Sequence, residues 1–453
     1  MHYYDDILAT VGNTPLVRLN KLAAGLPATV LAKVEAFNPG GSSKDRIGLS
    51  MIRAAEAAGQ LKPGGTIVEC TSGNTGVGLA MAAVVLGYRT VFCMPDKVAK
   101  EKIHLLKSYG AEVVVCPTAV PPESPDSYYS VARRIERERP NAFLTNQYDN
   151  PANPAAHYRT TGPELWEQTA GKIDVFVTSI GTGGTISGTA KYLKEKNPQV
   201  RIVGADPIGS ILYQWFHTHT MGEAHTYKVE GIGEDMVCGA MDFKVVDQVR
   251  QVDDRQSFLM ARRLAREEGI FAGGSSGAAV HVALELAKEV GKGKTIVVLL
   301  PDSGNAYVSK FYSDEWMRDL GFLETPGPGT VRDVLKGRSQ KLITGKKGEK
   351  IGEVIEEMKK HGISQMPVLD SDGSAIGMIH EYDLLNGLIA GNYKMGDTID
   401  ALIAPVQGVV TPETTIPQLR QVFAQDNVAV VREGQKVVAI LTKIDLIEFL
   451  ASK

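Results

Sequence analysis

The sequence lacks the charge imbalance by which nucleic acids and anionic membranes attract proteins. Its 453 residues contain 49 lysines and arginines against 52 aspartates and glutamates, and the net charge at pH 7 is -3. Such a balance provides no long-range attraction for a polyanion. We therefore expect neither a nucleic acid nor a membrane as a partner, and small molecules as substrates instead.

Long hydrophobic runs are also missing, and so is a secretory leader. The stretch MHYYDDILATVGNTP (1–15) places acids and a turn where a signal peptide needs a basic flank and an apolar run. No later stretch reaches the roughly 18 consecutive apolar residues that a membrane-spanning helix requires. These absences predict a cytoplasmic protein.

Cysteine is scarce, and its spacing fits no metal-binding or redox motif. Cys70, Cys93, Cys116 and Cys238 include no CxxC pair, and three of them lie in or beside apolar runs typical of strands. Such cysteines are usually buried thiols. We expect no disulfide and no metal site.

The sequence does contain a regular alternation of apolar runs and helical stretches between about residues 28 and 302. TIVEC (66–70) precedes the helical VGLAMAAVVLG (77–87), and TVFCMP, AEVVVCP, DVFVTSI, RIVGAD and TIVVLLP follow. These runs are continuous rather than alternating, which is typical of parallel strands covered by helices on both faces. The pattern predicts an α/β fold with mostly parallel sheets and with active-site loops at the carboxyl ends of the strands.

This alternation ends at LETPGPGT (323–330), whose prolines and glycines predict a linker. We expect a catalytic domain at 1–322 and a second domain at 331–453, divided into repeats at about 331–391 and 392–453.

The second domain contains an internal repeat. IHEYDLLNGL (379–388) and LTKIDLIEFL (441–450) share one pattern, in which Asp383 and Asp445 are equivalent. Each segment follows two strand-like runs around a polar turn. The repeat predicts two similar supersecondary units.

Three loops of the first domain contain glycine and hydroxyl residues beside a helix. They are TSGNTG (71–76), GTGGT (181–185) and GGSSG (273–277). Backbone N–H groups at a helix N-terminus favour an anion, and glycine lets a phosphate approach. A Walker A loop is excluded because no lysine follows GTGGT before Lys191, and a dinucleotide loop with Asp206 as its ribose acid lacks a required glycine. A small phosphorylated cofactor fits best, although GTGGT alone is compatible with a tight turn and TSGNTG with a helix N-cap.

Together with Lys44, these loops form a recognisable set of motifs. Lys44 follows two glycines and two serines in GGSSKDR (40–46). The set resembles the pyridoxal-phosphate enzymes of fold type II and, among them, the cystathionine β-synthases. The resemblance covers residues 5–322 and includes NTPLVRLN, FNPGGSSKDRI, NQYDNPANPAAHY, VEGIGEDM and LLPDSG. It implies two α/β subdomains with mostly parallel sheets and pyridoxal 5'-phosphate as the cofactor.

The resemblance also implies a role for individual residues. Lys44 is the catalytic residue and forms the Schiff base with the cofactor. The other implied cofactor contacts are Asn74 at the ring oxygen, Ser275 at the pyridine nitrogen, and Gly181, Thr182, Gly183, Gly184 and Thr185 at the phosphate. The implied substrate contacts are Thr71, Ser72, Thr75, Gln147, Tyr148, Gly231 and Glu234.

The activity implied is a β-replacement that joins serine and homocysteine into cystathionine, with hydrogen sulfide formed from cysteine in a side reaction. O-Acetylserine sulfhydrylases share Lys44, TSGNTG and GTGGT, so a cysteine synthase is the alternative. The acidic pair Glu234 and Asp235 in VEGIGEDM favours a cystathionine β-synthase, because carboxylates attract the amino group of homocysteine and sulfide has none. A nicotinamide dehydrogenase and a non-enzymatic adenylate sensor are rivals from other classes.

The repeat pair resembles a tandem CBS (Bateman) module, which implies an adenosyl ligand such as S-adenosylmethionine, AMP or ATP. Thr442 and Asp445 match the ribose-contacting pair of that family, whereas His380 replaces the threonine before Asp383. Because the catalytic resemblance begins near residue 5, we expect no haem segment and no haem. By analogy with both families we expect at least a homodimer.

Overall fold

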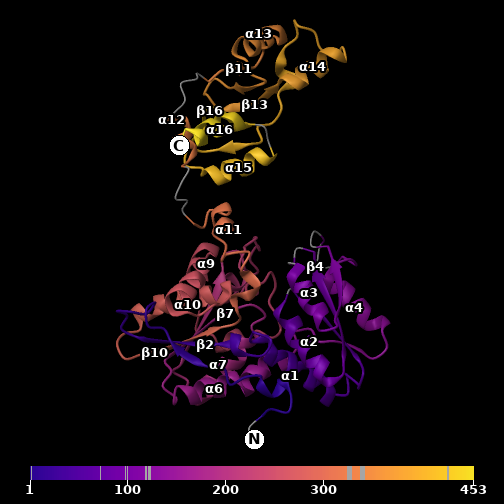
Figure 1. Ribbon diagram of the computed structural model, residues 1–453, viewed down its shortest axis with the longest axis vertical. Helices are drawn as coiled ribbons and strands as arrows, with labels where there is room; N and C mark the ends of the chain where they lie inside the picture. The colour runs from indigo at the N-terminus through magenta and orange to yellow at the C-terminus, as the bar shows by residue number, and fades with distance from the viewer. Residues whose placement is uncertain are drawn as a thin grey trace. The chain divides into compact units, whose positions relative to one another are not determined.

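A computed structural model describes residues 1, 3–71, 73–96, 98, 100–117, 120, 124–323, 329–336, 342–425 and 428–452. It divides into two compact units, Met1–Tyr312 and Ser313–Lys453 (Figure 1). The sequence predicted that the catalytic domain extends to residue 322. In the structure the first unit ends at Tyr312, and α11 (Asp314–Asp319) belongs to the second unit. There Asp319 accepts a hydrogen bond from Gln421 through its backbone carbonyl, at 2.9 Å.

The first unit contains two separate sheets that lie side by side (Figure 1). The larger sheet has the order β1-β2-β10-β7-β8-β9 and is parallel except where β1 pairs with β2. Its strands are β1 (Leu16–Arg18), β2 (Thr29–Val34), β7 (Val175–Ser179), β8 (Arg201–Pro207), β9 (Gln248–Val252) and β10 (Thr295–Leu300). The smaller sheet is wholly parallel, in the order β5-β4-β3-β6. Its strands are β3 (Thr66–Cys70), β4 (Arg89–Pro95), β5 (Glu112–Cys116) and β6 (Ala142–Leu144).

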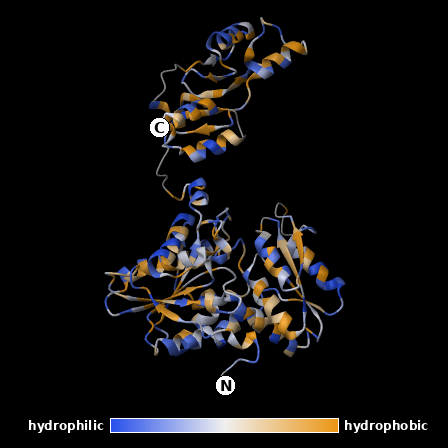
Figure 2. Ribbon diagram, in the orientation of Figure 1, coloured by the Kyte–Doolittle hydropathy of each residue, from blue (hydrophilic) through white to orange (hydrophobic). Residues whose placement is uncertain are grey.

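Helices separate most of these strands. They are α1 (Lys44–Ala57), α2 (Asn74–Leu86), α3 (Lys100–Ser108), α4 (Tyr128–Glu138), α5 (Ala152–Arg159), α6 (Thr161–Gln168), α7 (Gly184–Lys196), α8 (Leu212–Thr218), α9 (Asp254–Arg263) and α10 (Gly274–Glu289). Every residue of β3 and β7 is buried, as expected for strands that helices cover on both faces. Figure 2 shows these central strands among the most hydrophobic parts of the unit. The predicted α/β fold with mostly parallel sheets is confirmed.

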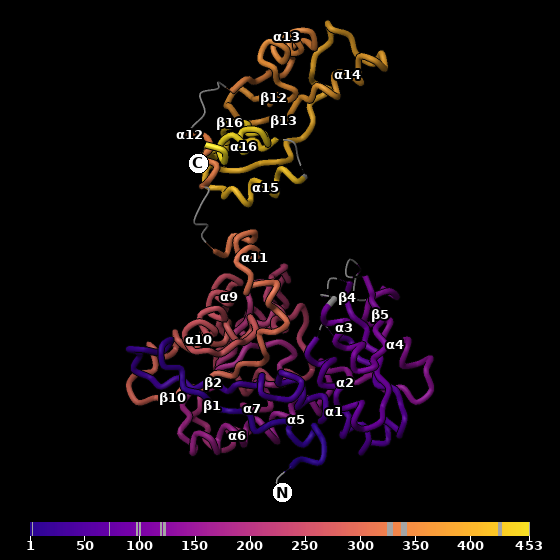
Figure 3. Tube along the Cα trace, viewed as in Figure 1, coloured from indigo at the N-terminus to yellow at the C-terminus, as the bar shows by residue number. Residues whose placement is uncertain are grey.

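The strands nearest the N-terminus, β1 and β2, belong to the same sheet as β10, which lies far along the sequence. The tube in Figure 3 brings β2, near residue 30, beside β10, near residue 297, and the two strands pair in parallel register from Thr29 with Thr295 to Val34 with Leu300. The expected thiol burial is also found, because all four cysteines are free and buried. No helix in the described part of the chain has both the length and the apolarity of a membrane span.

Helices α1 and α2 approach each other closely behind Lys44. A Cβ atom on Gly78 of α2 would lie 2.6 Å from the carbonyl oxygen of Lys44, and one on Gly48 of α1 would lie 2.7 Å from the carbonyl carbon of Gly78. Only glycine permits this approach. The start of α1 is thereby packed against α2, the helix that begins within TSGNTG.

A buried group of four charges also fixes α1. Arg46 forms ion pairs with Glu35 and Glu164, each at 2.6 Å, and Lys33 pairs with Glu164 at 2.6 Å. These four residues, here called the charge quartet, come from β2, the turn after it, α1 and α6. Because two positive and two negative groups are paired, burial leaves no uncompensated charge.

The second unit repeats one supersecondary arrangement twice. The sheets β11-β12-β13 and β14-β15-β16 each join a parallel pair to an antiparallel pair. The elements are α12 (Val331–Lys336), β11 (Gly345–Lys346), α13 (Ile351–His361), β12 (Gln365–Leu369), β13 (Ala375–His380), α14 (Glu381–Ile389), β14 (Val409–Val410), α15 (Ile416–Gln425), β15 (Val428–Glu433), β16 (Lys436–Thr442) and α16 (Lys443–Ala451). The predicted internal repeat is therefore present in the topology.

The cores of the two repeats exchange their N-terminal segments. Val331 and Val334 of α12 pack in the second repeat's core, with Leu419 and Leu441. Ile399, beyond the expected division at 391, packs in the first repeat's core. The sheets meet where Met378 contacts Val430 and Val437.

Candidate active site

A cavity of about 740 Å³ lies in the first unit, where loops leave the carboxyl ends of β3, β7 and β10. Most of the predicted site residues line it: Lys44, Thr71, Asn74, Thr75, Gln147, Tyr148, Gly181, Thr182, Gly183, Thr185, Gly231, Glu234 and Ser275. Gly184, the buried first residue of α7, does not line the cavity. Ser72 lies outside the described residues. Residues up to 231 positions apart, from Lys44 to Ser275, thus meet at one site.

Lys44 is the first residue of α1, and its side chain enters the cavity. Burial lowers the pKa of its amine, while the charges of Asp302, Glu35 and Glu234 oppose that shift. Within the described residues, Nζ of Lys44 forms no hydrogen bond and no ion pair. A desolvated amine without a partner is suited to nucleophilic attack and to proton transfer.

GTGGT forms a phosphate-sized cradle at the start of α7. Gly183 has φ of +85°, and a Cβ atom there would lie 2.4 Å from Sδ of Met241. The first backbone N–H groups of a helix have no intrahelical acceptor, so they are available to an anion. The adjacent Ser179 also has a buried hydroxyl oxygen without a hydrogen-bond partner, and it lines the same cavity.

Two side chains of α5 hold the hydroxyls of this cradle. Asn153 donates to Oγ1 of Thr182 at 3.1 Å. His157 lies 3.2 Å from Oγ1 of Thr185 and 2.9 Å from Oγ1 of Thr161. Burial lowers the pKa of His157 well below its ordinary value, and Arg46 and Lys44 lower it further, so the ring is neutral. Sequence reasoning missed both residues, although they lie in the quoted motif NQYDNPANPAAHY.

Asn74 is oriented by a buried acid. Its amide nitrogen donates to Asp302 at 2.9 Å, and the Tyr307 hydroxyl donates to the same carboxylate oxygen at 2.7 Å. The other oxygen of Asp302 is buried without a partner. LLPDSG was recognised in the sequence, but no local signal connects Asp302 with Asn74, which lies 228 positions away.

The predicted substrate-binding residues form a hydrogen-bonded group. Thr75 donates to Oε1 of Gln147 at 2.6 Å, and the Gln147 backbone N–H donates to Glu69 at 3.1 Å. Oγ1 of Thr71 accepts from the backbone N–H groups of Gly73 and Gly76. This loop therefore has a fixed shape.

A charge bridge crosses the cavity wall and was not predicted. Glu230 pairs with Lys102 of α3 at 2.5 Å and with Lys310. Burial alone would raise the pKa of Glu230, but the two lysines outweigh it and lower that pKa. Lys102 also lies 5.4 Å from the centre of the Tyr307 ring.

In the second unit, the two predicted ribose-contacting aspartates differ in their contacts. Asp445 accepts hydrogen bonds from the Thr442 backbone N–H and hydroxyl, both at 2.6 Å, in a capping box that begins α16. His380, the residue before α14, forms no side-chain cap, and Asp383 lines a cavity of about 450 Å³ with Asn386 and Tyr393.

Comparisons with known proteins agree with this architecture. The sequence pattern of the pyridoxal-phosphate dependent enzyme family matches residues 7–302, and that of the CBS domain matches 331–390 and 404–452. The cystathionine β-synthase of Oryctolagus cuniculus is 41% identical over 99% of this chain and 85% of its own length. The cystathionine β-synthase of Dictyostelium discoideum is 39% identical over 98% of this chain and 92% of its own length.

The chain belongs to the cystathionine β-synthase family of pyridoxal-phosphate dependent enzymes. Its C-terminal CBS domains are matched as predicted. A cysteine synthase of Staphylococcus aureus is 44% identical over 96% of its own length, but it corresponds to only 67% of this chain. The crystal structure of a hydrogen sulfide-producing enzyme from Fusobacterium nucleatum has a TM-score of 0.63 and 36% identity, and covers 67% of this chain and all of its own.

The cavity of this family member fits pyridoxal 5'-phosphate. An unpaired buried amine, a glycine cradle at a helix N-terminus and the partnerless oxygens of Ser179 and Asp302 meet the needs of an aldehyde, a phosphate and a polar ring. Lys44, Asn74, Ser275 and the 181–185 loop are the residues that would hold it. When bound, the cofactor links covalently to amino groups and withdraws electrons from the Cα of an amino acid.

Proposed function

We propose that this enzyme condenses L-serine with L-homocysteine to L-cystathionine and water, and releases hydrogen sulfide from cysteine in a side reaction. The observation that carries the proposal is the unpaired Lys44 amine in one cavity with the TSGNTG, GTGGT and GGSSG loops. Full-length similarity to cystathionine β-synthases supports the choice of substrates.

Different residues of the cavity bind the substrate and transfer its protons. Thr71, Thr75 and Gln147 bind the substrate carboxylate, and this fixes the serine Cα near Lys44. Lys44 Nζ takes the Cα proton and gives it to the β-hydroxyl, which leaves as water when the bond between oxygen and the β-carbon breaks. The amine then takes the proton of the homocysteine thiol as its sulfur bonds to the β-carbon, and Lys44 delivers that proton to Cα.

Ser275 supports elimination over competing reactions. A hydroxyl at the pyridine nitrogen cannot stabilise a protonated ring as a carboxylate does. Electron withdrawal from Cα is then weaker, and a short-lived carbanion favours loss of a β-substituent over transamination or racemisation. Ser275 lies in the first turn of α10 and lines the cavity.

Lys44→Ala tests the pivot of this mechanism. We expect loss of the visible absorption of the purified protein and a fall in turnover of about 1,000-fold or more, because a positioned proton-transfer group contributes about that factor. Lys191→Ala on α7, outside the cavity, is the matched control. A Lys44→Ala protein with normal spectrum and turnover would refute the proposal.

The alternative is an O-acetylserine sulfhydrylase with a regulatory module. Steady-state kcat/KM for homocysteine and for sulfide, each with serine and with O-acetylserine, separates the two activities. We expect serine with homocysteine to be the best pair. A clear preference for sulfide with O-acetylserine would reassign the enzyme as a cysteine synthase.

We further propose that the CBS domains bind an adenosyl compound through Thr442 and Asp445, with S-adenosylmethionine favoured because it reports methionine supply to an enzyme that consumes homocysteine. In the first repeat Asp383 lines a cavity as well, but His380 stands where the ribose-contacting threonine is expected, so the one adenosyl site that we propose is the one in the second repeat. Activation would require the ligand to bind one arrangement of the module more tightly than another.

Calorimetric titration of wild type, Asp445→Ala and Asp383→Ala with S-adenosylmethionine, AMP and ATP assigns the ligand and its site. We expect Asp445→Ala to abolish binding and the bound ligand to change turnover. Absence of binding by all three compounds would refute the site, and binding without a change in turnover would refute the regulation. The ultraviolet-visible spectrum of the same preparations tests the expected absence of haem.

A further inference from the structure

Four tyrosines line the same cavity as Glu234: Tyr128, Tyr129, Tyr148 and Tyr227. Burial raises the pKa of each of these hydroxyls, and the nearby charge of Glu234 raises each of them further. We call these five residues the tyrosine box. Its members come from separate parts of the chain. Tyr128 and Tyr129 begin α4, which packs beside the smaller sheet, and Glu234 lies about 100 positions later, in VEGIGEDM (229–236).

Three of these rings contact one another at the cavity. The ring centres of Tyr128 and Tyr129 are 4.0 Å apart, and those of Tyr129 and Tyr148 are 5.9 Å apart in an edge-to-face arrangement. A Cβ atom on Gly233 would lie 2.5 Å from the Tyr227 hydroxyl oxygen, so this tyrosine packs directly against the residue before Glu234. Only glycine at position 233, with φ of +73°, permits that contact.

The box contains a carboxyl group that no cation pairs with. In the part of the chain that the structure describes, no side chain forms a hydrogen bond or ion pair with the carboxyl groups of Glu234 and Asp235. The lysines 102 and 310, which also line the cavity, are already paired with Glu230. Burial raises the pKa of Glu234 to about 8, and the charges of Asp235 and Asp206 contribute, while Lys44 opposes them.

We propose that the tyrosine box binds the ammonium group of the second substrate and thereby selects amino-acid thiols over sulfide. The proposal rests on the proposed β-replacement and assigns its specificity to these residues. Aromatic faces attract an ammonium group through their electron-rich centres, and a desolvated carboxyl group adds a charge-assisted hydrogen bond. Hydrosulfide has neither an ammonium group nor a positive charge, so the acidic groups offer it no attraction.

The experiment compares thiols that differ in one group. Homocysteine, its deamino analogue 4-mercaptobutyrate and sulfide are each supplied with serine, and kcat/KM is measured by product formation. For wild type we expect homocysteine to exceed 4-mercaptobutyrate by about 100-fold, the contribution of a charge-assisted hydrogen bond and an aromatic contact. Glu234→Gln should reduce that preference to about tenfold or less, and should lower kcat/KM for homocysteine by a larger factor than kcat/KM for sulfide.

Two variants of one tyrosine keep the test independent of Glu234. Tyr128→Phe retains the aromatic face and should keep the preference within about twofold, whereas Tyr128→Leu should reduce it by about fivefold. Glu138→Gln, at the far end of α4 and exposed, is the control and should behave as wild type. Cofactor content by absorbance confirms that each variant is folded and loaded.

The outcomes separate this proposal from the activity on which it rests. If wild type forms no cystathionine from serine and homocysteine, the proposed reaction fails. If it forms cystathionine but the preference for homocysteine over 4-mercaptobutyrate is the same in wild type, Glu234→Gln and Tyr128→Leu, the reaction stands and the tyrosine box is not the ammonium site.

Discussion

At the scale of single residues, His157 connects the phosphate cradle to the body of the first unit. Its ring lies between the hydroxyls of Thr161 and Thr185, is fully buried, and is neutral. Each ring nitrogen therefore has one hydroxyl partner, and the orientation of Thr185 toward the cavity depends on this link. We therefore propose that His157 positions Thr185 for contact with the cofactor phosphate.

We expect His157→Leu to weaken cofactor binding by about tenfold, because a buried hydroxyl that loses its partner costs about 1–3 kcal/mol. The measurement is absorbance titration of the cofactor-free protein with pyridoxal 5'-phosphate. Thr169→Val, which removes another buried hydrogen bond at a residue that does not line the cavity, is the control and should lower stability without changing this affinity. Equal affinities for wild type and His157→Leu would contradict the role.

Individual residues were predictable where a short motif contains the whole feature. Lys44, TSGNTG and GTGGT could be recognised because each lies within a few consecutive residues, and the cavity brings them together. Asp302 and Asn74 pair across 228 positions, and no pattern in one sequence reports such a contact. Tyr128 and Tyr129 resemble any amphipathic helix start, so their place at the cavity required the fold.

At the scale of elements, the charge quartet determines how α1 sits in the first unit. Lys33 and Glu35 are fully buried, Arg46 is 3% exposed, and Glu164 of α6 accepts from both bases. Burial alone would raise the pKa of Glu164, but hydrogen bonds and charges of Arg46 and Lys33 lower it to about 2. Since Lys44 begins the helix that carries Arg46, the quartet also positions the Lys44 amine.

Glu164→Gln should reduce the free energy of unfolding by about 3 kcal/mol at pH 7, because breaking a buried ion pair leaves positive charge uncompensated. The folded-state pKa is below the ordinary value of 4.5, so this stabilisation is present above pH 4.5 and is lost as pH falls toward 2. The difference between wild type and Glu164→Gln should therefore shrink over that interval.

Urea unfolding followed by tryptophan fluorescence, repeated from pH 7 to pH 3, measures this difference. Glu112→Gln is the matched control, because Glu112 also forms two hydrogen bonds with one arginine, Arg139, but on the surface. Its removal should cost less than about 1 kcal/mol. A Glu164→Gln effect no larger than that of Glu112→Gln, or independent of pH, would contradict the argument.

Strands could be predicted where the hydrophobic pattern alone defines them. The sequence did not predict which strands pair with one another. TIVEC, DVFVTSI and TIVVLLP all form strands, because continuous apolar runs suit a sheet covered on both faces. That β2 joins β10, or that α12 packs in the core of the second repeat, depends on contacts between distant residues. The hydrophobic pattern of a segment indicates that the segment is buried, but it does not indicate which other segment packs against it.

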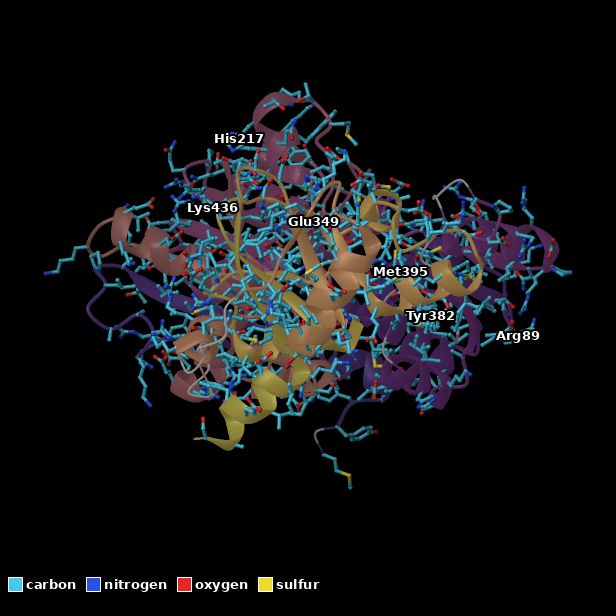
Figure 4. All side chains as sticks on the ribbon, turned by 90° about the horizontal axis from the view of Figure 1, so that it is seen from above. Arg89, His217, Glu349, Tyr382, Met395 and Lys436 are labelled. Atoms are coloured by element: carbon cyan, nitrogen blue, oxygen red, sulfur yellow. The ribbon has the colours of Figure 1, made fainter. Side chains whose placement is uncertain are left out.

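At the scale of the whole molecule, the two repeats expose equivalent apolar helix faces. On α14 the exposed side chains are Tyr382, 71% exposed and labelled in Figure 4, with Leu385 and Ile389. On α16 they are Ile444, Ile447 and Leu450. Exposed apolar patches on a soluble protein commonly mark an interface, and equivalent patches on paired repeats suit a two-fold axis.

We expect the enzyme to be at least a homodimer through these helix faces, and Leu385→Lys with Ile447→Lys to weaken it. Burial of each side chain contributes about 1.5 kcal/mol or more, so the double variant should raise the dimer dissociation constant by at least about 100-fold. Sedimentation velocity over a range of concentrations measures this constant. Ile376→Lys, also an exposed apolar position of the second unit but on β13, should leave it unchanged. A wild-type monomer would contradict the dimer, and a double variant that dimerises like wild type would place the contact on another surface, because lysines at the centre of an apolar interface cannot be accommodated without losing their hydration.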